Sequence, residues 1–321
     1  MQGKAETKPA TALYAGIDVS KARLDAQLHG MGERLQVANE AGGHARLVER
    51  LETHGVVKVM MEPTSHYHRE IHRRLHEAGI GVVLINPLRA RLFAQAHGKL
   101  AKTDAIDAAM LARMAAQTEL KPVAPPSAQQ QELQELTSAR RAALAERTAL
   151  NNRLGATTVA FLKGELTKRL RSIAGHIDRL QARIDALIKA DPEMSRKARI
   201  LRSIPGIGPV TTQALLAQLA ELGQLTAKQA AALTGLAPYA RDSGTIQGKR
   251  HIHGGRADLR SALYMAALTA SRKNPDLELF YQNLIARGKA AKLALAAVAR
   301  KLVILANTLV SQNRSWELKT A

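Results

Sequence analysis

The stretch from Gln129 to Ala190 constrains the fold of this chain more than any other feature. It repeats leucine at helical spacings and has almost no helix breakers, which predicts two long, charged helices. Such a pattern is typical of a coiled coil, antiparallel or between chains, and equally of a plain helical bundle. The preceding segment, 121–127, carries three prolines and ends in Ser127, a good helix N-cap, so we interpret it as a linker.

The helical stretch divides the chain into parts. A chain of 321 residues has room for about two domains. We therefore expect a first domain over residues 1–121, a helical connector over 122–195 and a C-terminal domain over 196–321.

The first part alternates strand-like and helix-like segments. Three consecutive strands are expected at 13–19, 23–28 and 33–37. Later segments are expected as helix 43–53, strand 56–61, helix 66–78, strand 80–85 and helices from Pro87. Three meandering strands followed by alternating helices and strands predict an α/β domain with a mixed sheet of the ribonuclease-H type.

The last part is expected to be helical around two glycine-rich segments. In Ile204-Pro-Gly-Ile-Gly-Pro209, a turn at Gly206 and Gly208 exposes backbone amides, as a helix-hairpin-helix does when it binds phosphate. A tight turn between helices is the alternative. Residues 235–255 are glycine-rich and basic, which predicts a loop, and helices are expected from Ala257, Asp276 and Lys289.

Composition limits the kind of core, the class of partner and the types of active site that this chain can have. Apolar residues make up 46% of the chain and aromatic residues 3%, so we expect a helix-rich protein with a core of Ala, Leu, Ile and Val. The net charge of +20 favours nucleic acid as the partner, although a ribosomal or chromatin protein is equally basic. The lack of cysteine excludes disulfides, thiolate zinc sites and cysteine nucleophiles. The first eleven residues lack an apolar core and the apolar stretch 293–310 is interrupted by Arg300 and Lys301, so we expect a cytoplasmic protein.

Four carboxylates of the first part are placed to act together. Asp18 ends the first expected strand, and Glu62 follows the strand that ends at Met61. Asp104 and Asp107 are three residues apart, so a helix places both on one face. Converging acids repel one another unless a divalent cation neutralises them, and oxygen ligands select Mg²⁺ or Mn²⁺, which catalyse phosphoryl transfer. Each acid alone is more typical of a cap or surface residue, and Asp104 is a candidate cap of its own helix.

Histidines recur at four-residue spacing in the same part. His68, His72 and His76 share one face of an expected helix, and His66 precedes them. Imidazoles at this spacing can bind a metal, but arginines are interleaved with them. We therefore interpret this helix as a basic surface that faces nucleic acid.

Several motifs resemble the IS110 family of insertion-sequence transposases over nearly the whole chain. In the first part these are Gly16-Ile-Asp-Val-Ser20, Met61-Glu-Pro-Thr-Ser65 and Lys102-Thr-Asp-Ala-Ile-Asp107, which resemble its RuvC-like DEDD domain. In the last part they are Ile204-Pro-Gly-Ile-Gly-Pro209, Gly235-Leu-Ala-Pro238, Asp242-Ser-Gly244 and Gly254-Gly-Arg-Ala-Asp-Leu-Arg260, which resemble its transposase domain.

The resemblance implies specific roles. It implies four magnesium ligands, which are Asp18, Glu62, Asp104 and Asp107, and it implies that Ser243 is the nucleophile. It also implies a structured noncoding RNA, the bridge RNA, that pairs with target and donor DNA. Members of the family assemble as dimers and tetramers, with active sites that combine one subunit's carboxylates with another's serine.

Ser243 itself has two interpretations. A serine beside Gly244 in a basic loop is usually a turn residue, and a hydroxyl nucleophile needs a base or metal-assisted positioning. Asp242 or a carboxylate of the metal site is a candidate proton acceptor. The residues expected to contact nucleic acid or stabilise the transferring phosphate are Gly206, Gly208, Arg241, Lys249, Arg250, Arg256 and Arg260.

Three other functions fit parts of the chain. A tyrosine recombinase is suggested by His253-Gly-Gly-Arg256 with Tyr264 and Tyr281, but it leaves the first domain without a purpose. A Holliday-junction resolvase uses only the carboxylates and leaves the C-terminal loop unexplained. A non-enzymatic RNA or chromatin binder fits the charge.

Overall fold

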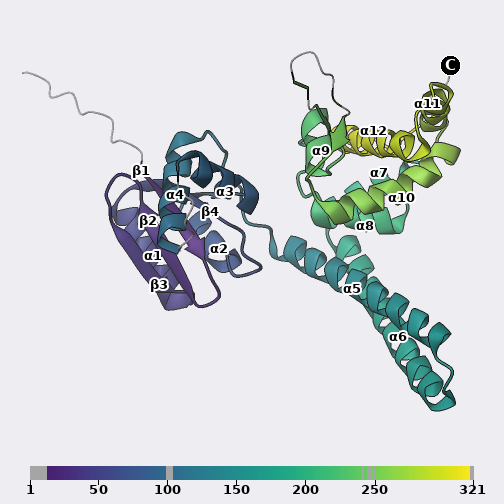
Figure 1. The fold of residues 1–321 in the computed structure, drawn as a ribbon, viewed down its shortest axis with the longest axis horizontal. Coiled ribbons are helices and arrows are strands. Elements are labelled where there is room, and N and C mark those ends of the chain that lie inside the picture. The colour runs from purple at the N-terminus through teal and green to yellow at the C-terminus, as the bar shows by residue number, and fades with distance from the viewer. Residues whose placement is uncertain (1–12, 99–103, 241, 244–247, 249, 319–321) are drawn as a thin grey trace, which may run out of the picture. The chain divides into compact units, whose positions relative to one another are not determined.

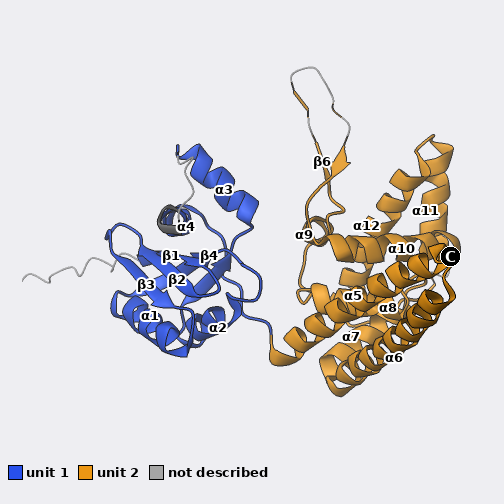
Figure 2. Ribbon diagram, turned by 60° about the horizontal axis from the view of Figure 1, so that its bottom comes forward, with its two compact units in different colours: residues 1–126 blue, residues 127–321 orange. Residues whose placement is uncertain are grey.

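The computed structural model describes residues 13–98, 104–240, 242–243, 248 and 250–318, with residues 104–106 described for their backbone only. The chain forms two compact units, residues 1–126 (unit 1) and residues 127–321 (unit 2), which Figure 2 distinguishes by colour. The units are described separately below.

Unit 1 is built on a five-stranded mixed sheet. Its strands are β1 (Leu13–Val19), β2 (Arg23–Leu28), β3 (Arg34–Ala38), β4 (Val56–Met61) and β5 (Gly81–Leu84). Their order is β3-β2-β1-β4-β5, with β1, β2 and β3 antiparallel and with β4 parallel to both β1 and β5. The predicted meander followed by alternating helices and strands is confirmed, within three residues at each boundary.

Helices pack on both faces of this sheet, as Figure 2 shows. On one face, α1 (Ala41–Thr53) and α2 (Arg69–Glu77) form a core with alternate strand residues, among them Ile17. On the other face lie α3 (Pro87–Ala96) and α4 (Asp104–Gln117), where Leu111 packs with Met60. Side chains alternate between faces along a strand, so β4 contributes Met61 to the first core and Met60 to the second.

The histidine helix does not present the surface expected from its sequence. His72 is 2% exposed, and its Nε2 lies 2.7 Å from the carbonyl oxygen of Val123 in the linker. Burial lowers the pKa of His72, so it stays neutral near pH 7 and adds no charge to the surface. The prediction that His72 faces nucleic acid is therefore wrong, because the linker covers this side of α2.

Unit 2 begins with the two long helices predicted from sequence. These are α5 (Ala128–Ala156) and α6 (Ala160–Ala190), which pack against each other as a helical hairpin (Figure 1). Ser127 caps α5 as predicted, since its hydroxyl accepts from the Gln130 amide at 3.1 Å. The Gln130 side chain donates to the carbonyls of Leu216 and Ala217, each at 2.9 Å, so the base of the hairpin belongs to unit 2.

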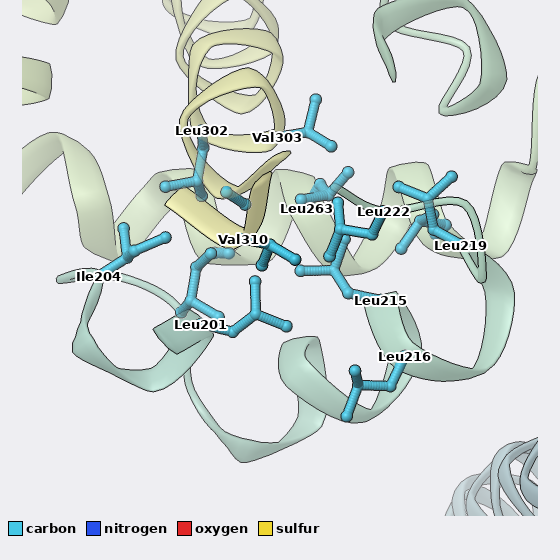
Figure 3. Packing of buried hydrophobic residues seen from close by; sticks show 14 of the residues in the cluster. Leu201, Ile204, Leu215, Leu216, Leu219, Leu222, Leu263, Leu302, Val303 and Val310 are labelled. Carbon is cyan, nitrogen blue, oxygen red and sulfur yellow. The ribbon is translucent and has the colours of Figure 1, made fainter. Parts of the chain in front are cut away.

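The rest of unit 2 packs around one apolar core. Its helices are α7 (Pro192–Ser203), α8 (Pro209–Gln218), α9 (Ala227–Leu233), α10 (Ala257–Lys273), α11 (Pro275–Ala286) and α12 (Ala291–Ser311). Figure 3 shows Leu201, Leu215, Leu263 and Leu302 meeting from α7, α8, α10 and α12. The buried part of this core consists of Leu, Ile, Val, Ala and Met, as the scarcity of aromatic residues predicted.

Helix α12 is the one helix of the described residues long and apolar enough to cross a membrane. Its Val298, Leu302 and Val303 are 0% exposed within the unit 2 core. The apolar stretch therefore has a packing role inside the protein.

The glycine-rich segment expected as a loop contains a short hairpin. Strands β6 (Pro238–Tyr239) and β7 (His251–Ile252) pair antiparallel, with Tyr239 opposite His251. This hairpin carries Ser243.

Candidate functional site

The first candidate site lies where two parallel strands of unit 1 end. Ile17 of β1 is paired with Met61 of β4, so Asp18 and Glu62 are each one residue further along neighbouring strands. Both side chains are partly buried. Their predicted meeting at one edge of the sheet follows from this register, because neighbouring parallel strands lie about 4.8 Å apart.

Helix α4, which carries Asp107, packs on the same face of the sheet. Gly16 and Asp18 share one face of the sheet because they are two residues apart on β1. A Cβ at Gly16 would collide with the backbone of Ala108 and Ala112 in α4, so the helix backbone rests directly on β1 at this point. Asp107 precedes Ala108 on this helix, and its convergence with Asp18 and Glu62 stays a prediction.

Asp104 begins the same helix, three residues before Asp107, as the sequence predicted. Its side chain lies outside the described residues, and among those described no three acidic or histidine side chains form a metal-binding group. Asp18 and Glu62 offer carboxylate oxygens at this edge, the ligand type that Mg²⁺ and Mn²⁺ prefer. The residues therefore fit a divalent cation in their chemistry.

A polar cluster beside this edge was not singled out from the sequence. Asp25 of β2 is opposite Asp18 in the antiparallel pair, and it is 2% exposed. Arg23 Nε, Arg34 Nη2 and Gln36 Nε2 donate to its carboxylate at 3.1, 3.3 and 2.8 Å. The sequence feature that could have predicted this cluster is the alternation of polar and apolar residues in Arg23-Leu-Asp25 and Arg34-Leu-Gln36. Such alternation places the polar residues of a strand on one face.

The second candidate site is the hairpin of unit 2, where Ser243 is exposed. Asp242 accepts from Arg250 Nη1 at 2.5 Å and from the Gly248 amide at 3.0 Å, which joins the two arms of the hairpin. Arg241 and Lys249, both predicted to contact nucleic acid, lie outside the described residues.

These contacts change the role considered for Asp242. The hydrogen bond from Arg250, together with the amide of Gly248, lowers the pKa of Asp242 below its ordinary value. A carboxylate with a lowered pKa is a weaker proton acceptor. Asp242 is therefore a poor candidate for the base that deprotonates Ser243.

Protein contacts at the base of the hairpin involve two of the predicted nucleic-acid ligands. Arg256 donates to the Glu221 carboxylate at 2.8 and 3.1 Å and also to the Gln218 carbonyl. Arg260 donates to the Gly254 carbonyl at 2.6 Å. Both arginines hold the hairpin in the fold, and their binding of nucleic acid stays a prediction.

Glycines in the predicted phosphate-binding turn have different surroundings. Gly206 has a φ of 106° and lies against Ala270 of α10, where any side chain would collide. Gly208 is the N-cap of α8, and a Cβ there would meet nothing within 4 Å. Gly206 therefore packs closely on α10, whereas Gly208 has open space, and phosphate binding by either glycine stays a prediction.

The tyrosine alternative lacks support in this geometry. Tyr281 packs against the unit 2 core, and Tyr264 is also partly buried. Arg256, which this alternative needs for phosphate binding, is paired with Glu221.

Comparison with known proteins identifies the family. Residues 15–161 match the transposase model for the DEDD domain of IS110, and residues 198–282 match the model described as transposase of the IS116/IS110/IS902 family. The chain belongs to the IS110 family of transposases. The two matches cover most of the transposase and both of its units.

Individual relatives agree with this assignment. A pilin gene-inverting protein of Moraxella bovis is 29% identical over 318 residues, which cover 95% of this transposase and 97% of that protein. A probable family 20 transposase of Pseudomonas aeruginosa is 29% identical, over 73% of this chain and 78% of its own. An uncharacterized protein of the insertion element IS110 from Streptomyces coelicolor is 30% identical over 46% of this chain and 36% of its own.

The transposase is therefore an enzyme that recombines DNA. The alternative of a non-enzymatic nucleic-acid binder is wrong. A resolvase that uses only the carboxylates does not account for the match of unit 2 to a transposase model.

Proposed function

We propose that this transposase is an RNA-guided DNA recombinase that cuts and rejoins strands with Mg²⁺ held in unit 1 and a covalent phosphoserine formed at Ser243. The observation that carries the proposal is the carboxylate edge. Asp18 and Glu62 end neighbouring parallel strands, and α4 rests on Gly16 beside Asp18. The pilin gene-inverting relative supports recombination rather than simple cleavage, since inverting a DNA segment requires its ends to be rejoined.

Asp18, Glu62, Asp104 and Asp107 would hold the metal. When bound, Mg²⁺ polarises a phosphate and stabilises the charge that develops during phosphoryl transfer. The protein's part is to fix the carboxylates: strand register sets Asp18 against Glu62, and close packing on Gly16 sets the position of α4. Mn²⁺ is an alternative ion, because it prefers the same oxygen donors.

Ser243 would conserve the energy of the broken bond. Its Oγ attacks the phosphorus, loses its proton and forms a new P–O bond, while a sugar oxygen leaves and takes up a proton. The hydroxyl of a second strand later attacks the phosphoserine, restoring a DNA diester and the serine hydroxyl. Since Asp242 is held by Arg250, a carboxylate of the metal site is the better candidate for the base.

The proposal also includes a guide RNA and an oligomeric state. The charge of +20 suits an RNA partner as well as DNA, and the family resemblance implies a bridge RNA. We expect a dimer or tetramer in the bacterial cytoplasm, associated with the nucleoid, with active sites that combine residues of two subunits. Sequencing the copurifying RNA tests guidance: one discrete species encoded beside the gene is expected, and heterogeneous bulk RNA contradicts it.

A protein–DNA adduct tests the serine. The Ser243→Ala variant should bind RNA and DNA but form no adduct on denaturing gels, because it lacks the attacking oxygen. Tyr264→Phe and Tyr281→Phe are the matched controls and should still form the adduct. An adduct in the serine variant, or its loss in a tyrosine variant that still binds DNA, contradicts the assignment.

A further inference from the structure

We infer that Asn39 is a positioning residue of the carboxylate edge, because its side chain joins the turn that follows Asp18 to the turn that contains Glu62. This inference deepens the proposed function, since it rests on a divalent cation binding at these two carboxylates. Asn39 touches neither the metal nor the DNA in this role. It limits how far Asp18 and Glu62 can move apart.

Asn39 holds the turn between β1 and β2. It directly follows β3, and its backbone amide donates to the carbonyl of Ala22 at 3.0 Å. Its side-chain Nδ2 donates to the carbonyl of Ser20 at 2.8 Å. Ser20 comes two residues after Asp18 in the chain. The backbone and the side chain of Asn39 therefore both fix the segment that leaves the end of β1.

The same side-chain amide also holds the turn that contains Glu62. Its Nδ2 donates to the carbonyl of Tyr67 at 3.2 Å. Glu62 is the first residue beyond β4, and the Thr64 amide donates to its carbonyl at 2.9 Å. The Tyr67 amide donates to the Thr64 carbonyl at 3.1 Å. The turn is thus anchored by β4 at one end and by Asn39 at the other.

One residue of this turn has an unfavourable backbone conformation. Ser65 has a φ of 48°, in the left-handed region that residues other than glycine rarely adopt. Such a conformation persists only where surrounding contacts hold it. The hydrogen bond from Asn39 to the carbonyl of Tyr67, two residues after Ser65, is one of these contacts. Without this bond the turn can relax toward a more favourable conformation, and Glu62 would move with it.

His44 orients the side chain of Asn39. His44 is 3% exposed, and its Nε2 lies 2.7 Å from Asn39 Oδ1. A carbonyl can only accept a hydrogen bond, so Asn39 must turn its Nδ2 toward the two carbonyls and its Oδ1 toward His44. Helix α1 holds His44 in place, because a Cβ at Gly43 would collide with the carbonyl of Ala38 at the end of β3. The amide group of Asn39 is therefore held at both its nitrogen and its oxygen.

Binding of Mn²⁺ tests the role of Asn39 without any cleavage step. Asn39→Ala should weaken Mn²⁺ binding to the nucleic-acid-free protein about tenfold or more, measured by electron paramagnetic resonance of the free ion, because residues that orient metal ligands have effects of this size. Leu28→Ala is the matched control, since Leu28 is 1% exposed and lies opposite Ala15, near the start of β1 and away from Asp18. It should destabilise unit 1 but change the affinity less than about twofold.

The outcomes separate this inference from the proposed function. If the wild-type protein binds Mn²⁺, an unchanged affinity in Asn39→Ala or an equal loss in Leu28→Ala would overturn the role of Asn39 alone. A wild-type protein that binds no Mn²⁺ would contradict the metal site itself and this inference with it.

Asn39→Asp separates anchoring from charge. This variant keeps the size of the side chain and adds a negative charge near the edge, so charge alone predicts tighter binding of Mn²⁺. An ionised carboxylate cannot donate to the carbonyls of Ser20 and Tyr67, so lost anchoring predicts weaker binding. We expect binding weakened about fivefold or more. Unchanged or tighter binding would overturn the inference.

Hydrogen exchange in EDTA follows the turn itself. The backbone amides of residues 62–68 should exchange about tenfold faster in Asn39→Ala than in the wild type, whereas those of β5 should exchange at the wild-type rate. Unchanged exchange at 62–68 would overturn the inference, because Asn39 would then not hold this turn.

His44→Ala keeps the proposal testable if the Asn39 variants do not fold. This variant leaves both carbonyl contacts of Asn39 and removes the one that orients its amide, so Mn²⁺ binding should weaken by about threefold. An unchanged Mn²⁺ affinity in His44→Ala would then overturn the inference.

Discussion

The two candidate sites are built in opposite ways. The carboxylate edge of unit 1 depends on strand register and on a helix packed against Gly16, both deep in the fold. Ser243 is exposed on a hairpin whose paired strands are two residues long, and its neighbour Asp242 is held by a surface ion pair with Arg250.

The two constructions suit the different roles proposed for the sites. Metal ligands must be fixed closely, so they belong on packed strands and helices. A nucleophile that binds DNA and later releases it can belong on an accessible hairpin, provided that the hairpin is anchored where it joins unit 2. The ion pair between Arg256 and Glu221 anchors it there. Three variants test this contrast, and they follow in order of decreasing expected effect.

Removing the carboxylates should have the largest effect. The Asp104→Ala/Asp107→Ala double variant should lose magnesium-dependent cleavage by at least about a thousandfold, because the metal would lose half of its ligands. The fold should remain, since alanine favours helix α4 and the partly buried Asp107 belongs to neither apolar core of unit 1. Cleavage assays with circular dichroism as the folding control check this, and wild-type cleavage in the double variant would refute the metal site.

Closing the space at Gly16 should have an intermediate effect. A Gly16→Ala methyl group collides with α4 backbone, so we expect the free energy of unfolding of unit 1 to fall by about 2–3 kcal/mol and cleavage to fall with it. Gly208→Ala, in open space, should change stability by no more than about 1 kcal/mol. Urea denaturation measures both. Similar losses at the two positions would show that α4 does not depend on this close approach.

Neutralising Asp242 should have the smallest effect. Since the Arg250 hydrogen bond lowers its pKa, Asp242 remains ionised from neutral pH down to below its ordinary titration range, and the ion pair is lost only as pH falls through the lowered value. Asp242→Asn should therefore leave adduct formation within about threefold of wild type, with the same pH profile between 6 and 9. A loss of adduct formation of about a hundredfold or more across this pH range would instead identify Asp242 as the base.

The sequence predicted unit 1 well because its signals are local. Apolar alternation located the strands, and Asp18 and Glu62 followed from strand ends that share an edge. His72 was misjudged because its burial comes from the linker at Val123, 51 residues away in the chain. No helical periodicity can reveal a covering segment so distant in sequence.

Unit 2 was predicted less completely for a related reason. The long helices and their cap at Ser127 are local features and are confirmed. Arg256 was expected to meet nucleic acid, but its contact with Glu221 depends on how α8, α9 and the hairpin pack. The close approach of Gly206 to Ala270, on another helix, likewise depends on tertiary packing. Charge and glycine patterns indicate which residues can bind nucleic acid. Tertiary contacts determine which of them already have partners within the protein.

Mapping the residue joined to DNA is the decisive measurement, because the proposed reaction needs both the carboxylates and Ser243. The adduct would be trapped on a DNA substrate in Mg²⁺, digested, and analysed by mass spectrometry for the peptide that retains a nucleotide. We predict attachment at Ser243, dependent on Mg²⁺ and absent from the Asp104→Ala/Asp107→Ala variant. Attachment at Tyr264 or Tyr281, or a Ser243 adduct that forms equally well without the carboxylates, would contradict the account.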